Sequence, residues 1–225
     1  MVCIHGDNRF PSALEYIGTA VSETPKEMKL FTPNTPKLHN AICDVIINDC
    51  KSHYISTQIQ TNFCDPVTKT AFITALCAFD HDTDKIIASN ILRITPTFLL
   101  GSFYDFCLPS LKSRWDEVCI LANENSKFLL CRRNFDKLLH FLISNIESRV
   151  DHVFVTDNGV LDYNRTPINV YVNNSLTQTE QIVQQLVFLS PRKIFFCNCQ
   201  DAILEQKIRS IFNNCLPRPR LTAKI

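Results

Sequence analysis

Glycine is scarce in this chain, with only four among its 225 residues, at positions 6, 18, 101 and 159. Phosphate-binding loops such as GxGxxG and GxxxxGK[ST] need several glycines at close spacing, because the backbone must approach the phosphate. The four glycines lie too far apart for either motif. The sequence therefore excludes the P-loop and Rossmann dinucleotide-binding classes.

An excess of charge of one sign and long apolar runs are missing as well. The formal net charge is +1, from 23 Lys and Arg against 22 Asp and Glu, so no overall field favours nucleic acid or an anionic membrane. No segment approaches the roughly 20 apolar residues of a membrane helix, and MVCIHGDNRF lacks the features of a signal peptide. The eleven cysteines stand mostly inside apolar runs, as reduced thiols do. We expect a cytoplasmic protein with no nucleic-acid partner and no membrane span.

The first half of the chain indicates helices followed by strands. Prolines and polar residues dominate residues 1–36, which we expect to wrap the domain with one short helix at 12–21. Behind Pro36, apolar residues recur at helical spacing and predict an amphipathic helix, at Leu38, Ile42, Val45 and Ile46.

Short apolar runs rich in β-branched residues follow, at 70–79 and 85–94. The acidic segment 80–84 between them has turn chemistry, so the two runs predict an antiparallel hairpin, and residues 117–122 predict a third strand.

The second half alternates between helix and strand patterns. Residues 126–149 carry one apolar stripe and predict the central helix, and residues 201–214 predict a closing helix. Further strands are expected at 152–156, 168–172, 184–189 and 193–197. This order predicts an α/β fold with a mixed, largely antiparallel central sheet flanked by helices.

Metal and covalent chemistry find little support. Cys197 and Cys199 would be half of a zinc site, but no second pair stands at a suitable spacing, so two thiols on one strand are the favoured interpretation. Residues 80–84 lack the glycine and distal Glu of a calcium loop. The six histidines are dispersed, and none neighbours a Gly-bounded Ser or Cys. We expect no metal site and no tightly bound cofactor.

One charged constellation stands out between residues 63 and 122. Arg93 ends the predicted hairpin, and Asp116 and Glu117 begin the next predicted strand. A half-buried Arg on a strand needs a carboxylate partner, and either acidic residue would serve. Such a pair is compatible with a purely structural role and with a catalytic one.

The layout around this constellation resembles the LuxI-type acyl-homoserine lactone (autoinducer) synthases, whose fold is related to the GNAT acyltransferases. The matching pieces are Arg93 with Pro96-Thr97, Trp115-Asp116, Phe63-Cys64-Asp65-Pro66, the helix at 126–149 and the strand at 152–156. The resemblance implies a single three-layer GNAT-like domain at 37–225 behind the wrapping segment 1–36.

The resemblance also implies an activity, the transfer of an acyl chain from an acyl carrier protein to the amine of S-adenosylmethionine, which makes a quorum-sensing signal. Asp116 or Glu117 would act as the base and Arg93 would orient it. S-adenosylmethionine and an acyl thioester would be substrates, bound by Phe63, Asp65, Trp115, Phe98 and Phe154.

The match is incomplete, which motivates a second hypothesis. The family's catalytic Glu, followed three residues later by Arg, falls here on Asp116 and Cys119, or on Glu117 and Ile120 if the register shifts by one residue. A catalytically degenerate relative that binds a ligand or a partner is therefore the alternative. A third possibility is that the layout match is a coincidence in another α/β domain.

Overall fold

A computed structural model describes residues 1–59, 65–126, 132–168, 170, 172–173, 175–197 and 199–216. The chain divides into two compact units, which we call unit 1 (Met1–Thr61 and Phe79–Asn125) and unit 2 (Asn62–Ala78 and Ser126–Ile225). Each unit carries a mixed three-stranded sheet together with helices. The α/β class predicted from the sequence is confirmed, with two small sheets in place of the single central sheet that we expected.

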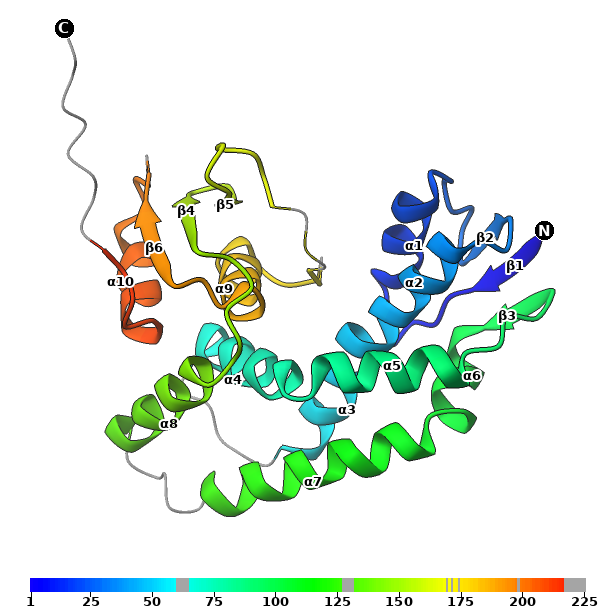
Figure 1. Cartoon of the computed structure of the whole chain (residues 1–225), viewed down its shortest axis with the longest axis horizontal. Helices are drawn as coiled ribbons and strands as arrows, with labels where there is room; N and C mark the ends of the chain where they lie inside the picture. The colour runs from blue at the N-terminus through cyan, green and yellow to red at the C-terminus, as the bar shows by residue number, and fades with distance from the viewer. Residues whose placement is uncertain are drawn as a thin grey trace, which may run out of the picture. The chain divides into compact units, whose positions relative to one another are not determined.

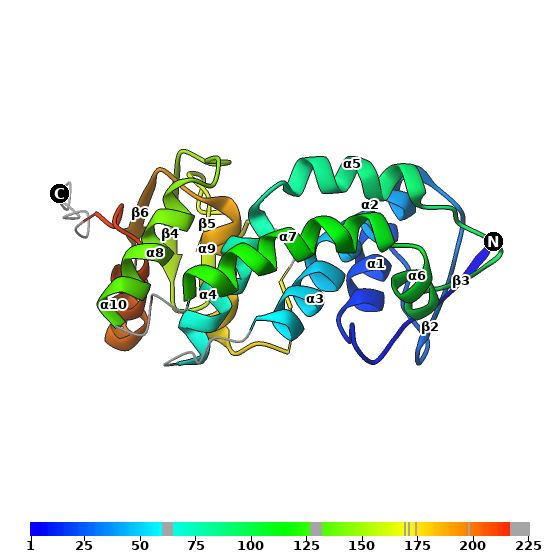
Figure 2. The ribbon, with the colours of Figure 1, turned by 90° about the horizontal axis from the view of Figure 1, so that it is seen from below.

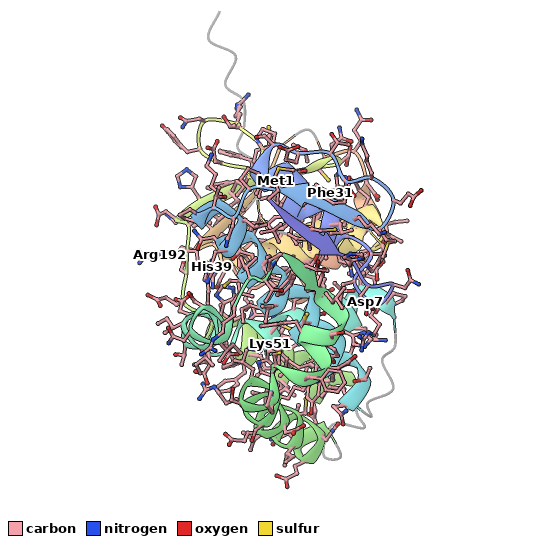
Figure 3. The ribbon with its side chains drawn as sticks, turned by 90° about the vertical axis from the view of Figure 1, so that its right-hand side faces the viewer. Met1, Asp7, Phe31, His39, Lys51 and Arg192 are labelled. Carbon is pink, nitrogen blue, oxygen red and sulfur yellow. The ribbon has the colours of Figure 1, made fainter. Side chains whose placement is uncertain are left out.

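The sheet of unit 1 has the order β2-β1-β3. β1 (Val2–His5) runs antiparallel to β2 (Lys29–Thr32) and parallel to β3 (Thr97–Leu99). One face is buried, with Ile4 inaccessible to solvent, whereas Phe31 on the other face is half-exposed at 51% (Figure 3). Residues 1–36 thus contain the middle strand of a sheet, the strand beside it and α1 (Ala13–Val21), which lies in the predicted helix 12–21.

A helical run with a π-turn inside it crosses unit 1. Pro36 begins α2 (Pro36–Val45) as predicted, and the Thr35 hydroxyl caps it by accepting the Leu38 amide. The π-helix η1 (Ile46–Cys50) and α3 (Lys51–Gln58) continue it. Unit 1 is completed by α5 (His81–Ile91), α6 (Leu100–Phe106) and α7 (Pro109–Ser126); Figure 2 shows α5 and α7.

The sheet of unit 2 has the order β5-β4-β6 (Figure 1). β4 (His152–Thr156) is antiparallel to β5 (Gly159–Leu161) and parallel to β6 (Lys193–Phe196). The helices of this unit are α4 (Pro66–Ala78), α8 (Arg132–Ser144), α9 (Gln178–Leu189) and α10 (Ala202–Ile211). α4 packs along α9 and α8, and this packing forms the core of the unit together with the buried side of the sheet.

Four predicted strands are wrong. Residues 70–79 and 85–94 lie mainly in α4 and α5, residues 117–122 in α7, and residues 184–189 in α9. A short apolar run fits a buried strand and a buried helix equally well. α4 buries eight of its residues on several sides, so its apolar pattern shows no helical period. α9 begins with a capping box between Thr177 and Glu180, a helix-start signal that precedes the run at 184–189.

Other predictions are confirmed within the described residues. Strands occupy 152–156 and most of 193–197, and α10 lies within the predicted helix 201–214. The predicted helix 126–149 corresponds to α8 only from Arg132 to Ser144, since Ser126 ends α7. In the predicted strand 168–172, residues 169 and 171 lie outside the described residues, and the other three are not in a strand. Within the described residues, no helix combines the length and the apolar character needed to span a membrane.

Candidate functional site

The two predicted catalytic carboxylates lie on α7, in unit 1. The Tyr54 hydroxyl donates a hydrogen bond to Asp116 Oδ1 at 2.7 Å, whereas Glu117 is exposed. Burial of the phenol, together with the neighbouring carboxylate of Asp116, raises the pKa of Tyr54 above its usual value of 10. The pair therefore holds a carboxylate in one orientation beside a protonated phenol.

Arg93, predicted to pair with Asp116 or Glu117 across neighbouring strands, lies exposed in the segment after α5. It makes no ion pair with any residue that the structure describes. The strand-to-strand pair was wrong because both segments are helical, so the sheet register that would bring the charges together is not formed.

The predicted substrate-binding residues are divided between the units. Trp115 and Phe98 belong to unit 1, where both are buried, and Phe98 packs against Phe103 with ring centroids 5.3 Å apart. Asp65 and Phe154 belong to unit 2, where Phe154 stacks on the Phe195 ring at 5.5 Å. Phe63 lies outside the described residues.

Asp65 has a structural role at the start of α4. Its carboxylate accepts the Thr68 amide at 3.0 Å and the Thr68 hydroxyl at 2.8 Å, and it forms an ion pair with Lys207 at 3.0 Å. Burial acts to raise the pKa of Asp65, but these hydrogen bonds and the Lys207 charge outweigh it and lower the pKa to about 2. The carboxylate thus caps α4 and links its start to α10 through the ion pair with Lys207.

Trp115 belongs to a buried ionic cluster that sequence reasoning missed. Its indole Nε1 donates to Asp84 Oδ2 at 3.0 Å, and the same oxygen accepts the Lys51 ammonium at 2.7 Å. Arg114 Nε donates to Asp84 Oδ1 at 3.1 Å, and Lys51 also donates to the carbonyl of Phe79 at 2.7 Å. Asp84, expected in a solvated turn, is only 1% exposed, because His81 begins a helix that turns this residue inward.

Hydrogen bonds connect the members of the ionic cluster. Three donors meet the Asp84 carboxylate, and an ammonium enclosed in this way is fully charge-paired. The π-turn at η1 ends immediately before Lys51 and adjusts the helical register that carries this side chain inward. We assign the cluster to stabilisation of unit 1.

A second charged group of unit 1 surrounds Arg9. Its guanidinium bonds both carboxylates that flank it, Asp7 at 2.9 Å and Asp105 at 2.7 Å, and lies over the Tyr104 ring at 4.9 Å. The hydrogen bonds that Arg9 donates to the Asp7 carboxylate are the main cause of the raised pKa of Arg9. Gly101 leaves room for the Asp7 carboxylate, since a Cβ atom there would overlap Asp7 Oδ2. The Arg9 charge in this group is therefore already paired with carboxylates of the same unit.

Unit 2 contains a pocket of about 330 Å³. The lining residues come from the end of α8 and the segment after it, from the segment after α9, and from the last residue of α10 and the segment after it. The apolar floor comprises Ile143, Ile146, Ile211 and Phe212. The polar rim comprises His140, Ser144, Ser148, Ser190, Arg192, Asn213 and Asn214. Pro191 completes the wall. No sequence motif marks this site, because its residues come from three separate segments.

Hydrogen bonds within the rim hold its polar side chains in place. The hydroxyls of Ser144, Ser148 and Ser190 donate to the carbonyls of Phe141, Val150 and Ile146 at 2.9, 3.0 and 3.1 Å. The Asn214 amide donates to the Pro191 carbonyl. Arg192 is largely exposed, and its guanidinium lies 3.7 Å from the Asp151 carboxylate (Figure 3). The three serine hydroxyls and the Asn214 amide are therefore held by contacts within unit 2.

Among the described residues, no group of three or more His, Cys, Asp or Glu side chains is arranged to hold a metal ion. Cys199 is buried beside Asp157, and burial together with that carboxylate raises the pKa of its thiol to about 11. The Cys199 thiol is accordingly protonated at neutral pH. No protein-family model, curated protein or solved structure matches the chain.

Proposed function

We propose that the protein is a small-molecule binding module whose site is the pocket of unit 2. The observation that carries this proposal is the pocket itself, at the ends of α8, α9 and α10. Its volume of about 330 Å³ falls in the range of natural ligand sites, roughly 300–1,000 Å³. An apolar floor with a few fixed polar groups is the usual composition of such sites.

The arrangement of unit 2 supports the proposal. The pocket is built where helices end beside the starts of the parallel strands β4 and β6. Ile211 and Phe212 are 2% and 3% exposed, so the floor is anchored in the core. A ligand on this floor would remove its own apolar surface from water, which supplies about 25 cal/mol per Å².

Substitution of Ser144 by Trp tests the proposal, because Ser144 is an exposed pocket residue at the end of α8 and the indole would occupy the cavity. The matched control is Lys137→Trp, two turns earlier on the same helix, exposed and outside the pocket lining. A fragment library is screened by NMR against the ¹⁵N-labelled full chain. We expect fragments that shift the amides of residues 143–148, 190 and 192, and the same shifts with Lys137→Trp but not with Ser144→Trp.

Failure of every fragment to perturb these amides would refute the binding function. Shifts that persist in the Ser144→Trp variant would place the fragments elsewhere and refute the assigned site. Circular dichroism spectra of both variants establish that each is folded.

The acyltransferase activity implied by the family resemblance is the alternative, with a GNAT-like three-layer domain, S-adenosylmethionine as acceptor and an acyl carrier protein as donor. The supporting observation is the hydrogen bond of Tyr54 to Asp116, which orients a carboxylate on the segment that carries the resemblance. Thiol release from acyl carrier protein thioesters with several amines tests it. Loss of that release in the double variant Asp116→Asn/Glu117→Gln would support acyl transfer, and no release by the unaltered protein would refute it.

A further inference from the structure

Three serines in the rim of the unit 2 pocket present hydrogen-bond acceptors, beside donor groups on Arg192, Asn213 and Asn214. The three serine hydroxyls that line it each donate their only hydrogen to a backbone carbonyl, at distances of 2.9 to 3.1 Å. A hydroxyl whose hydrogen is engaged in this way offers only oxygen lone pairs to a ligand. Ser144, Ser148 and Ser190 therefore act toward the pocket as acceptors.

The helices add a negative electrostatic potential from the same side. α8 ends at Ser144, α9 at Leu189 and α10 at Ile211. The pocket lining contains Ser144, Ile211 and the α9 C-cap Ser190, so it adjoins all three helix ends. The carbonyl end of a helix carries about half a negative charge, which favours cations near its last turn. Three such ends at one cavity reinforce one another.

Arg192 and His140 are the basic residues of the rim, and the guanidinium of Arg192 opposes a cation. This guanidinium is 73% exposed and lies 3.7 Å from the Asp151 carboxylate, which is 72% exposed. Charges this exposed are strongly screened by water. Arg192 lines the same cavity, but its charge is screened by water and faces the Asp151 carboxylate, so we expect the helix ends and the serine oxygens to outweigh it.

From these contacts we propose that the pocket binds a primary alkylammonium ion, an inference that rests on the proposed binding function. The ammonium group would donate its hydrogens to the serine oxygens of the rim, and the alkyl chain would lie on Ile143, Ile211 and Phe212. An ammonium has three donors and no acceptor, which complements a rim whose serines offer acceptors. A carboxylate of the same length has only acceptors, so it cannot donate to these serine oxygens.

Three probes of equal chain length test the preference for an ammonium group separately from the ability of the pocket to bind any ligand. They are hexylammonium, hexan-1-ol and hexanoate. Their dissociation constants are measured by NMR titration of the full chain at constant pH and salt. We expect hexylammonium to bind at least tenfold more tightly than hexanoate, with hexan-1-ol between them. Equal or tighter binding of hexanoate would overturn the ammonium class and leave the binding function standing. No binding of any probe would overturn both.

Two variants and a control test which rim residues contact the ammonium group. Ser144→Ala/Ser148→Ala removes two acceptors and is expected to weaken hexylammonium about tenfold without weakening hexanoate. Ser210→Ala removes a hydroxyl that donates to the Lys207 carbonyl on α10, outside the pocket lining, and should leave every affinity unchanged. Arg192→Gln removes the opposing charge and should strengthen hexylammonium about twofold. Weaker ammonium binding in Arg192→Gln, or no loss in the double serine variant, would contradict the proposed contacts.

Discussion

Lys51 and Asp84 form an ion pair in the core of unit 1, with Lys51 Nζ 2.7 Å from Asp84 Oδ2 and each side chain only 1% exposed. The two residues lie on α3 and α5, so the pair fixes the spacing of these helices. Trp115 and Arg114 bring α7 to the same carboxylate. A buried pair of this kind is costly to break, because either partner alone would remain as an uncompensated charge.

Substitution of Lys51 by Met tests that cost. The aliphatic part of the side chain is kept, but Asp84 loses its ammonium partner, and we expect the free energy of unfolding to fall by about 3–5 kcal/mol. The free energy is measured by urea denaturation, followed by tryptophan fluorescence. Trp115 is the only tryptophan of the chain and lies in unit 1, so its signal reports the unfolding of the unit that contains the ion pair. The control Lys85→Met removes a more exposed ion pair with Asp44 and should cost less than about 1 kcal/mol. Equal losses of unfolding free energy in Lys51→Met and Lys85→Met would contradict the larger contribution that we assign to the buried pair.

Substitution of Trp115 by Phe removes the indole N–H from the Asp84 carboxylate and keeps an aromatic ring in the core. The hydrogen bond reaches a buried charged group, so we expect a loss of about 2–3 kcal/mol. Tyr54→Phe is the matched comparison, since its hydroxyl meets the half-buried Asp116, which water can reach after the change. It should cost about 1 kcal/mol. Unfolding is followed by circular dichroism, and a larger loss for Tyr54→Phe than for Trp115→Phe would be inconsistent with this ranking.

The depressed pKa of Asp65 predicts an acid-dependent contribution to the stability of unit 2. The folded value of about 2 lies below the ordinary value of 3.8, so the stabilisation is present above about pH 5 and disappears as the pH falls toward 2. The whole contribution is about 2 kcal/mol for this largely buried carboxylate. We expect Asp65→Asn to lower stability at pH 6 and to make no difference near pH 2, in urea denaturation at each pH. Glu147→Gln, at an exposed position of the same unit, is the control. An equal loss at both pH values would show that the Asp65 charge is not the cause.

Substitution of Gly101 by Ala places a Cβ atom against Asp7 Oδ2, which Arg9 holds in place. The carboxylate has to move and the bond to Arg9 weakens, so we expect a loss of about 1–3 kcal/mol. In an Asp7→Ala background the overlap is absent, and the same glycine substitution should cost markedly less. A double-mutant cycle on thermal unfolding measures this coupling. Additive effects would mean that the cost of the alanine arises elsewhere.

Local signals predicted several elements well. The start of α2 follows from Thr35 and Pro36, which supply a cap and a fixed first backbone angle. The strands at 152–156 and 193–197 are β-branched or aromatic runs directly after polar segments, and both are present. The runs in α4 and α9 are equally apolar, but their conformation depends on packing against each other, and local propensity is too weak to indicate it.

By itself, the sequence excludes glycine-rich phosphate loops and a strong overall electrostatic field, and it determines where several helices and strands begin. The tertiary structure alone decides which apolar runs are helices, that Lys51 meets Asp84, and that three helix ends surround the unit 2 pocket. The physical reason is the range of the interactions. Caps, prolines and periodicity act over a few neighbouring residues, whereas buried ion pairs and pockets join segments tens of residues apart.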